Sequence, residues 1–63
     1  MNNVFTVYIA RSVSPFDPGT EAELLEDYRS DGAQAGLFLG WRNGKLIEIY
    51  CQFNEFDIKR EQA

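Results

Sequence analysis

Ten carboxylates and a single cysteine are the side chains with the most obvious chemistry in this sequence, which contains no histidine. Glu23 and Asp27, four residues apart, would share one side of a helix, where paired carboxylates can act as acid and base or hold a hard cation. We expect neither role, because a convex helix surface supplies no cleft. Cys51 has no histidine to accept its proton and points to the same side of a predicted strand as Ile47 and Ile49, so we expect a buried, unreactive thiol.

The composition also excludes several classes of site. With one cysteine and no histidine, zinc, haem and iron–sulfur centres lack their usual ligands. The turn around Asp17 does not have the ligand spacing of a calcium loop, and the glycines form no phosphate-binding motif. The sequence therefore predicts no catalytic residue, no metal site and no cofactor.

Negative charge is concentrated in one stretch of the chain. From position 17 to position 31, six carboxylates stand against one cation, Arg29, so that this stretch sums to −5 while the whole chain sums to −4. The six are Asp17, Glu21, Glu23, Glu26, Asp27 and Asp31. With a pI near 4.5, direct binding of nucleic acid is not expected, because lysine and arginine lead phosphate binding. A cationic partner is expected instead.

The acidic stretch is predicted to form one amphipathic helix from Glu21 to Ser30. Rotation by 100° per residue gathers Leu24, Leu25 and Tyr28 on one side, opposite the acidic side chains. Two N-caps are compatible with the sequence, either Asp17 followed by Pro18 or Thr20 with Glu23 three residues later. Gly32 can take the left-handed conformation that ends many helices.

Strands are predicted on both sides of this helix. Residues 4–12 alternate apolar and polar side chains, which is typical of a strand. Further on, Asn43-Gly44 between two apolar runs is the pattern of a type I′ hairpin. A two-residue turn fixes the register of this hairpin, from Arg42 opposite Lys45 to Gly36 opposite Cys51.

The two faces of the predicted hairpin differ in composition. One face carries Gly36 and Gly40 among large apolar side chains, and these glycines would let the helix backbone lie close. The other face is apolar except for Glu48, which is unusual for a solvated sheet, so a covering segment is expected. Residues 54–59 could provide it or add a strand. The apolar residues of this second face are Leu37, Leu39, Trp41, Leu46 and Tyr50.

Together these elements predict one small globular domain, residues 1–63, of the α+β class. The expected order is β-α-β-β with room for a short fourth strand, and the amphipathic helix covers one face of an antiparallel sheet. Placing the strand at 45–53 between the other two keeps all neighbours antiparallel and the crossover right-handed.

The chain is expected to be a soluble protein of a reducing cytoplasm. A single cysteine excludes an intramolecular disulfide. The first residues show no basic leader followed by a long apolar run, and nothing reaches the length of a membrane span. No membrane partner is therefore expected.

The acidic helix admits a structural and a functional interpretation. An acidic helix face commonly serves solubility alone. Neighbouring carboxylates on a helix lie about 5–6 Å apart, however, which is close to the phosphate spacing along a nucleic-acid strand, about 6–7 Å along the backbone. A rigid ridge of this kind can imitate a short run of phosphates.

In this respect the chain resembles the small acidic inhibitors of phages and mobile elements, in particular anti-CRISPR proteins. The resemblance is one of type and rests on the negative ridge from Asp17 to Asp31, one small domain and a low pI. It implies a stoichiometric inhibitor in the host cytoplasm, not an enzyme, that occupies the basic DNA-binding or PAM-recognition surface of an effector complex. The predicted partner-binding residues are Asp17, Glu21, Glu23, Glu26, Asp27, Asp31 and Trp41. Acidic inhibitors of restriction enzymes and of other DNA-binding proteins fit the same pattern.

The alternative hypothesis is a small interaction module or adaptor subunit. It would bind a protein partner through Trp41, Leu39 and Tyr50, since an exposed aromatic centre is typical of an interface hot spot. A monomer is expected for the inhibitor, whereas a homodimer that buries this patch would favour the adaptor. Trp41, beside Arg42 at the hairpin tip, is expected to stay accessible in both cases.

Overall fold

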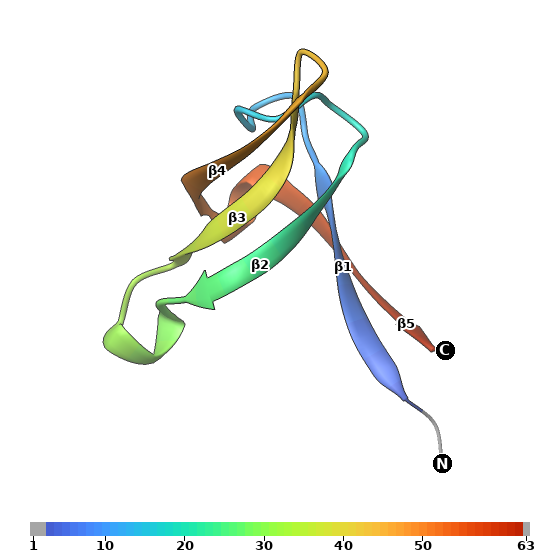
Figure 1. The fold of residues 1–63 in the computed structure, drawn as a ribbon. Helices are drawn as coiled ribbons and strands as arrows, with labels where there is room; N and C mark the ends of the chain where they lie inside the picture. Colours follow the sequence, from blue (N-terminus) through green and yellow to red (C-terminus); the bar gives the residue numbers. More distant parts are fainter. Residues whose placement is uncertain (1–2, 63) are drawn as a thin grey trace.

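A computed structural model describes residues 3–62; Met1, Asn2 and Ala63, which belong to the predicted domain, lie outside the described part. The described chain forms five strands and two short 3₁₀ turns (Figure 1). The strands are β1 (Val4–Ala10), β2 (Glu21–Asp27), β3 (Ala35–Arg42), β4 (Lys45–Gln52) and β5 (Phe56–Gln62), and the turns are η1 (Arg29–Asp31) and η2 (Phe53–Glu55).

All neighbouring strands are antiparallel, in the order β4-β3-β2-β1-β5. β2 pairs with β1 through Ala22 and Glu21 and then with β3 from Glu23 onward, so it passes from one part of the sheet to the other. Figure 1 shows the β1–β5 pair crossing the β2–β3–β4 part at a steep angle. Val4 lies opposite Gln62, which brings the two ends of the described chain together.

The predicted α+β class with a helix at Glu21–Ser30 is wrong. Residues of that segment form β2, followed by the single turn η1. Its alternation places Ala22 in the core and leaves Glu21 and Glu23 exposed. At Leu25 the pairing with β3 shifts by one residue, a bulge that interrupts this alternation.

Pairing with distant strands explains why helix propensity does not decide this segment. Isolated helices of about ten residues are marginal in water, whereas β2 hydrogen-bonds to a strand on each side for part of its length. Both predicted caps make other contacts. The Thr20 hydroxyl donates to the Asp17 carbonyl oxygen at 2.6 Å, and the Asp17 carboxylate accepts from the Asn43 N–H. Gly32 does adopt φ = 88°, but it ends η1.

The predicted hairpin is confirmed with its register, from Arg42 opposite Lys45 to Gly36 opposite Cys51. The turn residues Asn43 and Gly44 both have positive φ, as a type I′ turn requires. The predicted strand order is wrong, because β4 is an outer strand of the sheet. The C-terminal segment does form a strand, but β5 pairs with β1.

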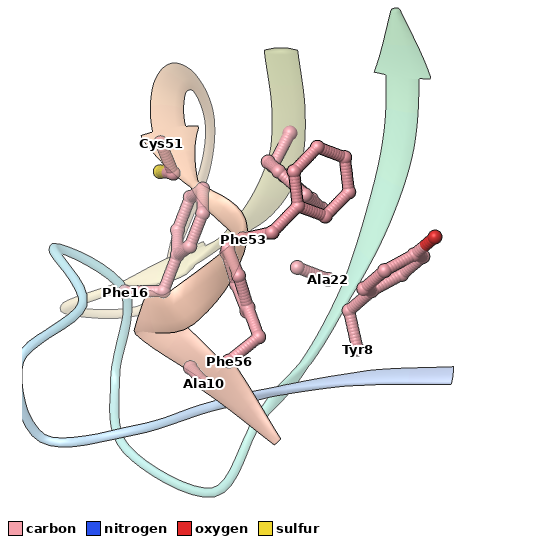
Figure 2. Packing of buried hydrophobic residues seen from close by; sticks show 8 residues of the cluster. Tyr8, Ala10, Phe16, Ala22, Cys51, Phe53 and Phe56 are labelled. Carbon is pink, nitrogen blue, oxygen red and sulfur yellow. The ribbon is translucent and has the colours of Figure 1, made fainter. Parts of the chain in front are cut away.

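Aromatic side chains from β1, the β1–β2 loop, β3, η2 and β5 form most of the core between the two parts of the sheet (Figure 2). Phe38 of β3 is completely buried and packs against Phe56 with ring centroids 4.3 Å apart. Tyr8 of β1 meets Phe38 edge to face at 5.3 Å. The cluster consists of Tyr8, Ala10, Phe16, Ala22, Phe38, Cys51, Phe53 and Phe56.

The two hairpin glycines accommodate neighbours other than a helix. A Cβ at Gly40 would lie 2.8 Å from the Phe16 ring, and one at Gly36 would lie 2.6 Å from the Glu26 carbonyl oxygen. Phe16, from the loop between β1 and β2, therefore occupies the place predicted for the helix.

Candidate protein-binding face

Three of the six predicted carboxylates lie together on one face of the sheet. Glu23 pairs with Leu39 of β3 and Glu26 pairs with Leu37, so both project to the side of β3 opposite the buried Phe38. The bulge at Leu25 makes this possible, because Glu23 and Glu26 are three residues apart and would otherwise point to opposite faces. Glu21 shares the side of Glu23 by strict alternation.

Asp17 instead ties a loop to the hairpin tip. Its carboxylate accepts the Asn43 N–H at 3.1 and 3.2 Å, and its own N–H donates to the Trp41 carbonyl oxygen at 2.8 Å. These bonds hold the β1–β2 loop against the end of β3, where Phe16 enters the core. Asp17 thus has a structural role and is not part of an acidic ridge.

Asp27 is neutralised by a cation of its own chain. The Arg29 guanidinium lies 2.6 Å from the Asp27 carboxylate and 4.0 Å above the Phe53 ring. The hydrogen bonds that Arg29 donates to the Asp27 carboxylate hold the pKa of Asp27 below its ordinary value and raise the pKa of Arg29. Asp31 lies in η1, beyond the end of β2. The predicted continuous ridge is therefore divided, since Asp17, Asp27 and Asp31 do not join the other three carboxylates.

The face that carries Glu23 is continuous across three strands, and we call it the outer face. One row of cross-strand neighbours is Glu23, Leu39 and Glu48, and the next is Glu26, Leu37 and Tyr50. At the hairpin end, Trp41 lies opposite Leu46. The outer face consists of Glu21, Glu23, Glu26, Leu37, Leu39, Trp41, Leu46, Glu48 and Tyr50.

Large apolar side chains of the outer face are open to solvent. Trp41 is 47% exposed, Leu46 53% and Tyr50 66%. The segment expected to cover them lies elsewhere, because Phe56 is in the core and β5 pairs with β1. The expected accessibility of Trp41 is confirmed. Four carboxylates and no lysine or arginine occupy the outer face, so its charge is negative around an apolar centre.

Tyr28 lies at the border of the outer face, where it contacts Tyr50 and holds the Glu26 carboxylate. The Tyr28 ring stacks on Tyr50 with centroids 5.8 Å apart, and its hydroxyl donates to Glu26 Oε1 at 2.8 Å. The hydrogen bond to Glu26, followed by the contact with Tyr50, raises the pKa of Tyr28 well above its ordinary value. Stacking limits the motion of Tyr50 and so reduces the entropy that a partner would have to remove on binding.

The Cys51 thiol is buried, as expected. Cys51 is 3% exposed, and burial, followed by the charge of Glu55, raises the pKa of its thiol to about 11. Within residues 3–62, no group of three or more potential ligands is placed to hold a metal ion. Neither 3₁₀ turn of this part of the chain has the length and hydrophobicity of a membrane-spanning helix.

An open groove lies beside the end of β4. Residues of β3, β4, η2 and the β1–β2 loop line it, namely Ala35, Tyr50, Cys51, Gln52, Asn54, Glu55, Arg11 and Val13. Arg11 donates to the Asn54 carbonyl oxygen at 2.8 Å and lies 3.9 Å from Asp57.

Sequence reasoning placed Leu46 in the apolar patch but missed Glu48 and Tyr28 as contributors to the candidate site. The hairpin register contained the signal for Glu48, because it already placed this residue on the face of Trp41. The Tyr28 contact depends on the position of β2 and had no local signal. Comparisons with models of protein families, with curated proteins and with solved structures give no match.

Proposed function

We propose that this protein is a binding module without catalytic activity, whose outer face docks a cationic and partly apolar surface of another protein. The supporting observation is the exposure of Trp41, Leu46 and Tyr50 among four carboxylates that no cation of the outer face neutralises. Aromatic anchors supply much of the affinity of protein interfaces. The surrounding carboxylates would select a basic partner and accelerate its association.

An affinity-capture experiment with matched bait variants tests this proposal. Trp41→Ala/Tyr50→Ser removes the aromatic anchors, and Glu23→Gln/Glu26→Gln/Glu48→Gln removes three charges from the outer face. Asp31→Asn/Asp57→Asn/Glu61→Gln removes three charges elsewhere and serves as the control. All the substituted side chains are exposed, so the variants are expected to fold.

The expected result is a protein partner retained by the wild type and the control and lost by both outer-face variants. Rising salt should release it, because exposed charge pairs are screened. Retention of the partner by both outer-face variants would contradict the proposal. Circular dichroism of each bait checks that a lost partner does not reflect lost folding.

An inhibitor that occupies a DNA-binding surface, as the anti-CRISPR resemblance implies, is the second candidate. It is favoured by Glu21 and Glu23, which project from alternate positions of β2 and thus lie about 6.8 Å apart along the strand. This distance is close to the phosphate spacing along a nucleic-acid strand.

The two candidates differ in the behaviour of the captured partner. A DNA-mimicking inhibitor should displace labelled duplex DNA from its partner and should tolerate Trp41→Ala/Tyr50→Ser better than loss of the carboxylates. A binding module should leave the DNA affinity of its partner unchanged and should require the aromatic residues.

A further inference from the structure

β4 is an outer strand, and among residues 3–62 no other strand pairs with its outer edge. In antiparallel pairs, alternate residues direct their N–H and C=O groups toward the partner strand, and the residues flanking a two-residue turn do so. From Arg42 opposite Lys45, this alternation directs Leu46, Glu48 and Tyr50 away from β3. Gln52 continues the row, and its N–H indeed bonds outward, to the Glu55 carboxylate at 2.6 Å.

The same three residues place their side chains on the outer face. Leu46, Glu48 and Tyr50 thus offer both backbone hydrogen bonds and accessible side chains to a strand laid along β4. Tyr50 and Gln52 of this row also line the open groove beside η2.

β4 lacks most devices that protect edge strands. Proteins commonly blunt a free edge with proline, bulges, short length or several charges. β4 has eight residues without proline, pairs with β3 without a register shift, and bears two charges, Lys45 and Glu48. β5, the other outer strand, bears Asp57, Lys59, Arg60 and Glu61 among seven residues.

Charge indicates which strand fits this edge. Self-pairing of β4 in the register that uses all three outward residues would place Glu48 of one copy opposite Glu48 of the other, and like charges there oppose association. A lysine or arginine opposite Glu48 is favourable instead. Glu23 lies in the same cross-strand row and adds to the negative potential.

We infer that β4 binds an extended segment of the partner as an additional antiparallel strand, with a lysine or arginine opposite Glu48 and apolar side chains opposite Leu46 and Tyr50. The inference rests on the proposed function and specifies the partner as a peptide of the pattern apolar-x-basic-x-apolar. Backbone bonds along the edge supply affinity, and the alternate side chains supply specificity.

A synthetic peptide, Thr-Val-Thr-Lys-Thr-Val-Thr with blocked ends, tests the inference by NMR titration of the nitrogen-labelled protein. One analogue is N-methylated at the lysine and one valine, whose amides would face β4. The matched analogue carries the two methyl groups on the inner threonines, whose amides would face away. The expected result is saturable binding that slows hydrogen exchange at the Leu46, Glu48 and Tyr50 amides. The first analogue should bind at least about tenfold more weakly than the second.

Exchanging the charges at Glu48 and at the peptide lysine tests whether these two residues lie opposite each other. Glu48→Lys should weaken binding of the lysine peptide and favour a peptide with glutamate in its place. Equal affinity of the two methylated analogues would overturn the inference while leaving side-chain docking on the outer face, and hence the proposed function, intact. Absence of saturable binding by the unmethylated peptide would also overturn it, whereas failure of the proposed function itself would appear as a partner retained by both outer-face baits.

Discussion

The two faces of the β3–β4 hairpin are built from alternate residues of the same short stretch, yet they differ in almost every physical respect. The inner face carries Phe38 and Cys51, both nearly inaccessible, while Trp41 and Tyr50 on the outer face are about half or more exposed. On the inner face, neighbours from β1, the β1–β2 loop, β2, η2 and β5 fill the space beside the glycines and Phe38. One face therefore packs the core of the fold, and the other leaves large side chains open to solvent.

The largest difference in stability between changes on the two faces is expected for truncation of Phe38 on the inner face. Phe38→Ala should destabilise the domain by about 3–5 kcal/mol, because it opens a cavity at the centre of the aromatic cluster. Leu39→Ala, on the adjacent outer position, should cost far less. Urea denaturation of both variants measures the difference, and similar losses for the two would contradict the division between the faces.

The inner-face thiol should resist alkylation. Since the pKa of Cys51 is raised to about 11 from an ordinary value of 9.0, its thiolate fraction near pH 8 should be about a hundredfold lower than that of a free cysteine. Iodoacetamide labelling of the native and the urea-unfolded protein measures this ratio. Equal rates would show that Cys51 is accessible.

The same shift predicts a dependence of stability on pH. A group whose pKa is raised on folding stabilises the folded state below its unfolded pKa, and this contribution is lost as the pH rises through the folded pKa. The stability that Cys51 provides should therefore decline between pH 9.0 and about 11. Cys51→Ala should show a smaller decline over this range in urea titrations, whereas an identical decline would exclude this thiol as its cause.

The contact between Gly40 and Phe16 should be sensitive to one added methyl group. Gly40→Ala should cost about 1–3 kcal/mol, because the new Cβ would lie 2.8 to 3.0 Å from the Phe16 ring. Phe16→Leu in the same chain should recover part of this loss if the clash causes it. A double-mutant cycle without coupling between the two positions would place the cost elsewhere.

The smallest effect is expected on the outer face. Replacement of Glu21, Glu23, Glu26 and Glu48 with glutamine should leave stability unchanged or raise it by a few tenths of a kcal/mol at low salt, since exposed like charges repel weakly. The gain should vanish at high salt. A marked loss of stability would mean that these carboxylates hold the fold together and are not free for a partner.

Local signals sufficed for the hairpin but not for β2. Asn43-Gly44 determines the turn and hence the register, so both hairpin faces were predictable, including the exposure of Trp41. The segment after Thr20 combines glutamate, alanine and leucine, which favour a helix. Its strand conformation depends on pairing with β1 and β3, and these contacts leave no periodic mark in so short a segment.

The candidate site was predictable to a similar extent. The acidic side chains were identified from the sequence. Which of them share a face depends on the bulge at Leu25, and no turn or cap residue in the sequence predicts this bulge. The ion pair of Asp27 with Arg29 and the bond from Asn43 to Asp17 removed two carboxylates from the predicted ridge. Both contacts depend on the strand conformation of β2 and on the loop before it. They could therefore be predicted only if β2 had first been recognised as a strand.

The pairing of Val4 with Gln62 has a practical consequence for joining this module to other chains. Because the two ends emerge side by side from the β1–β5 pair, the domain can be inserted within a surface loop of a host protein as well as fused at one terminus. β4 stands at the opposite end of the strand order, so such a graft would leave its free edge available to a ligand.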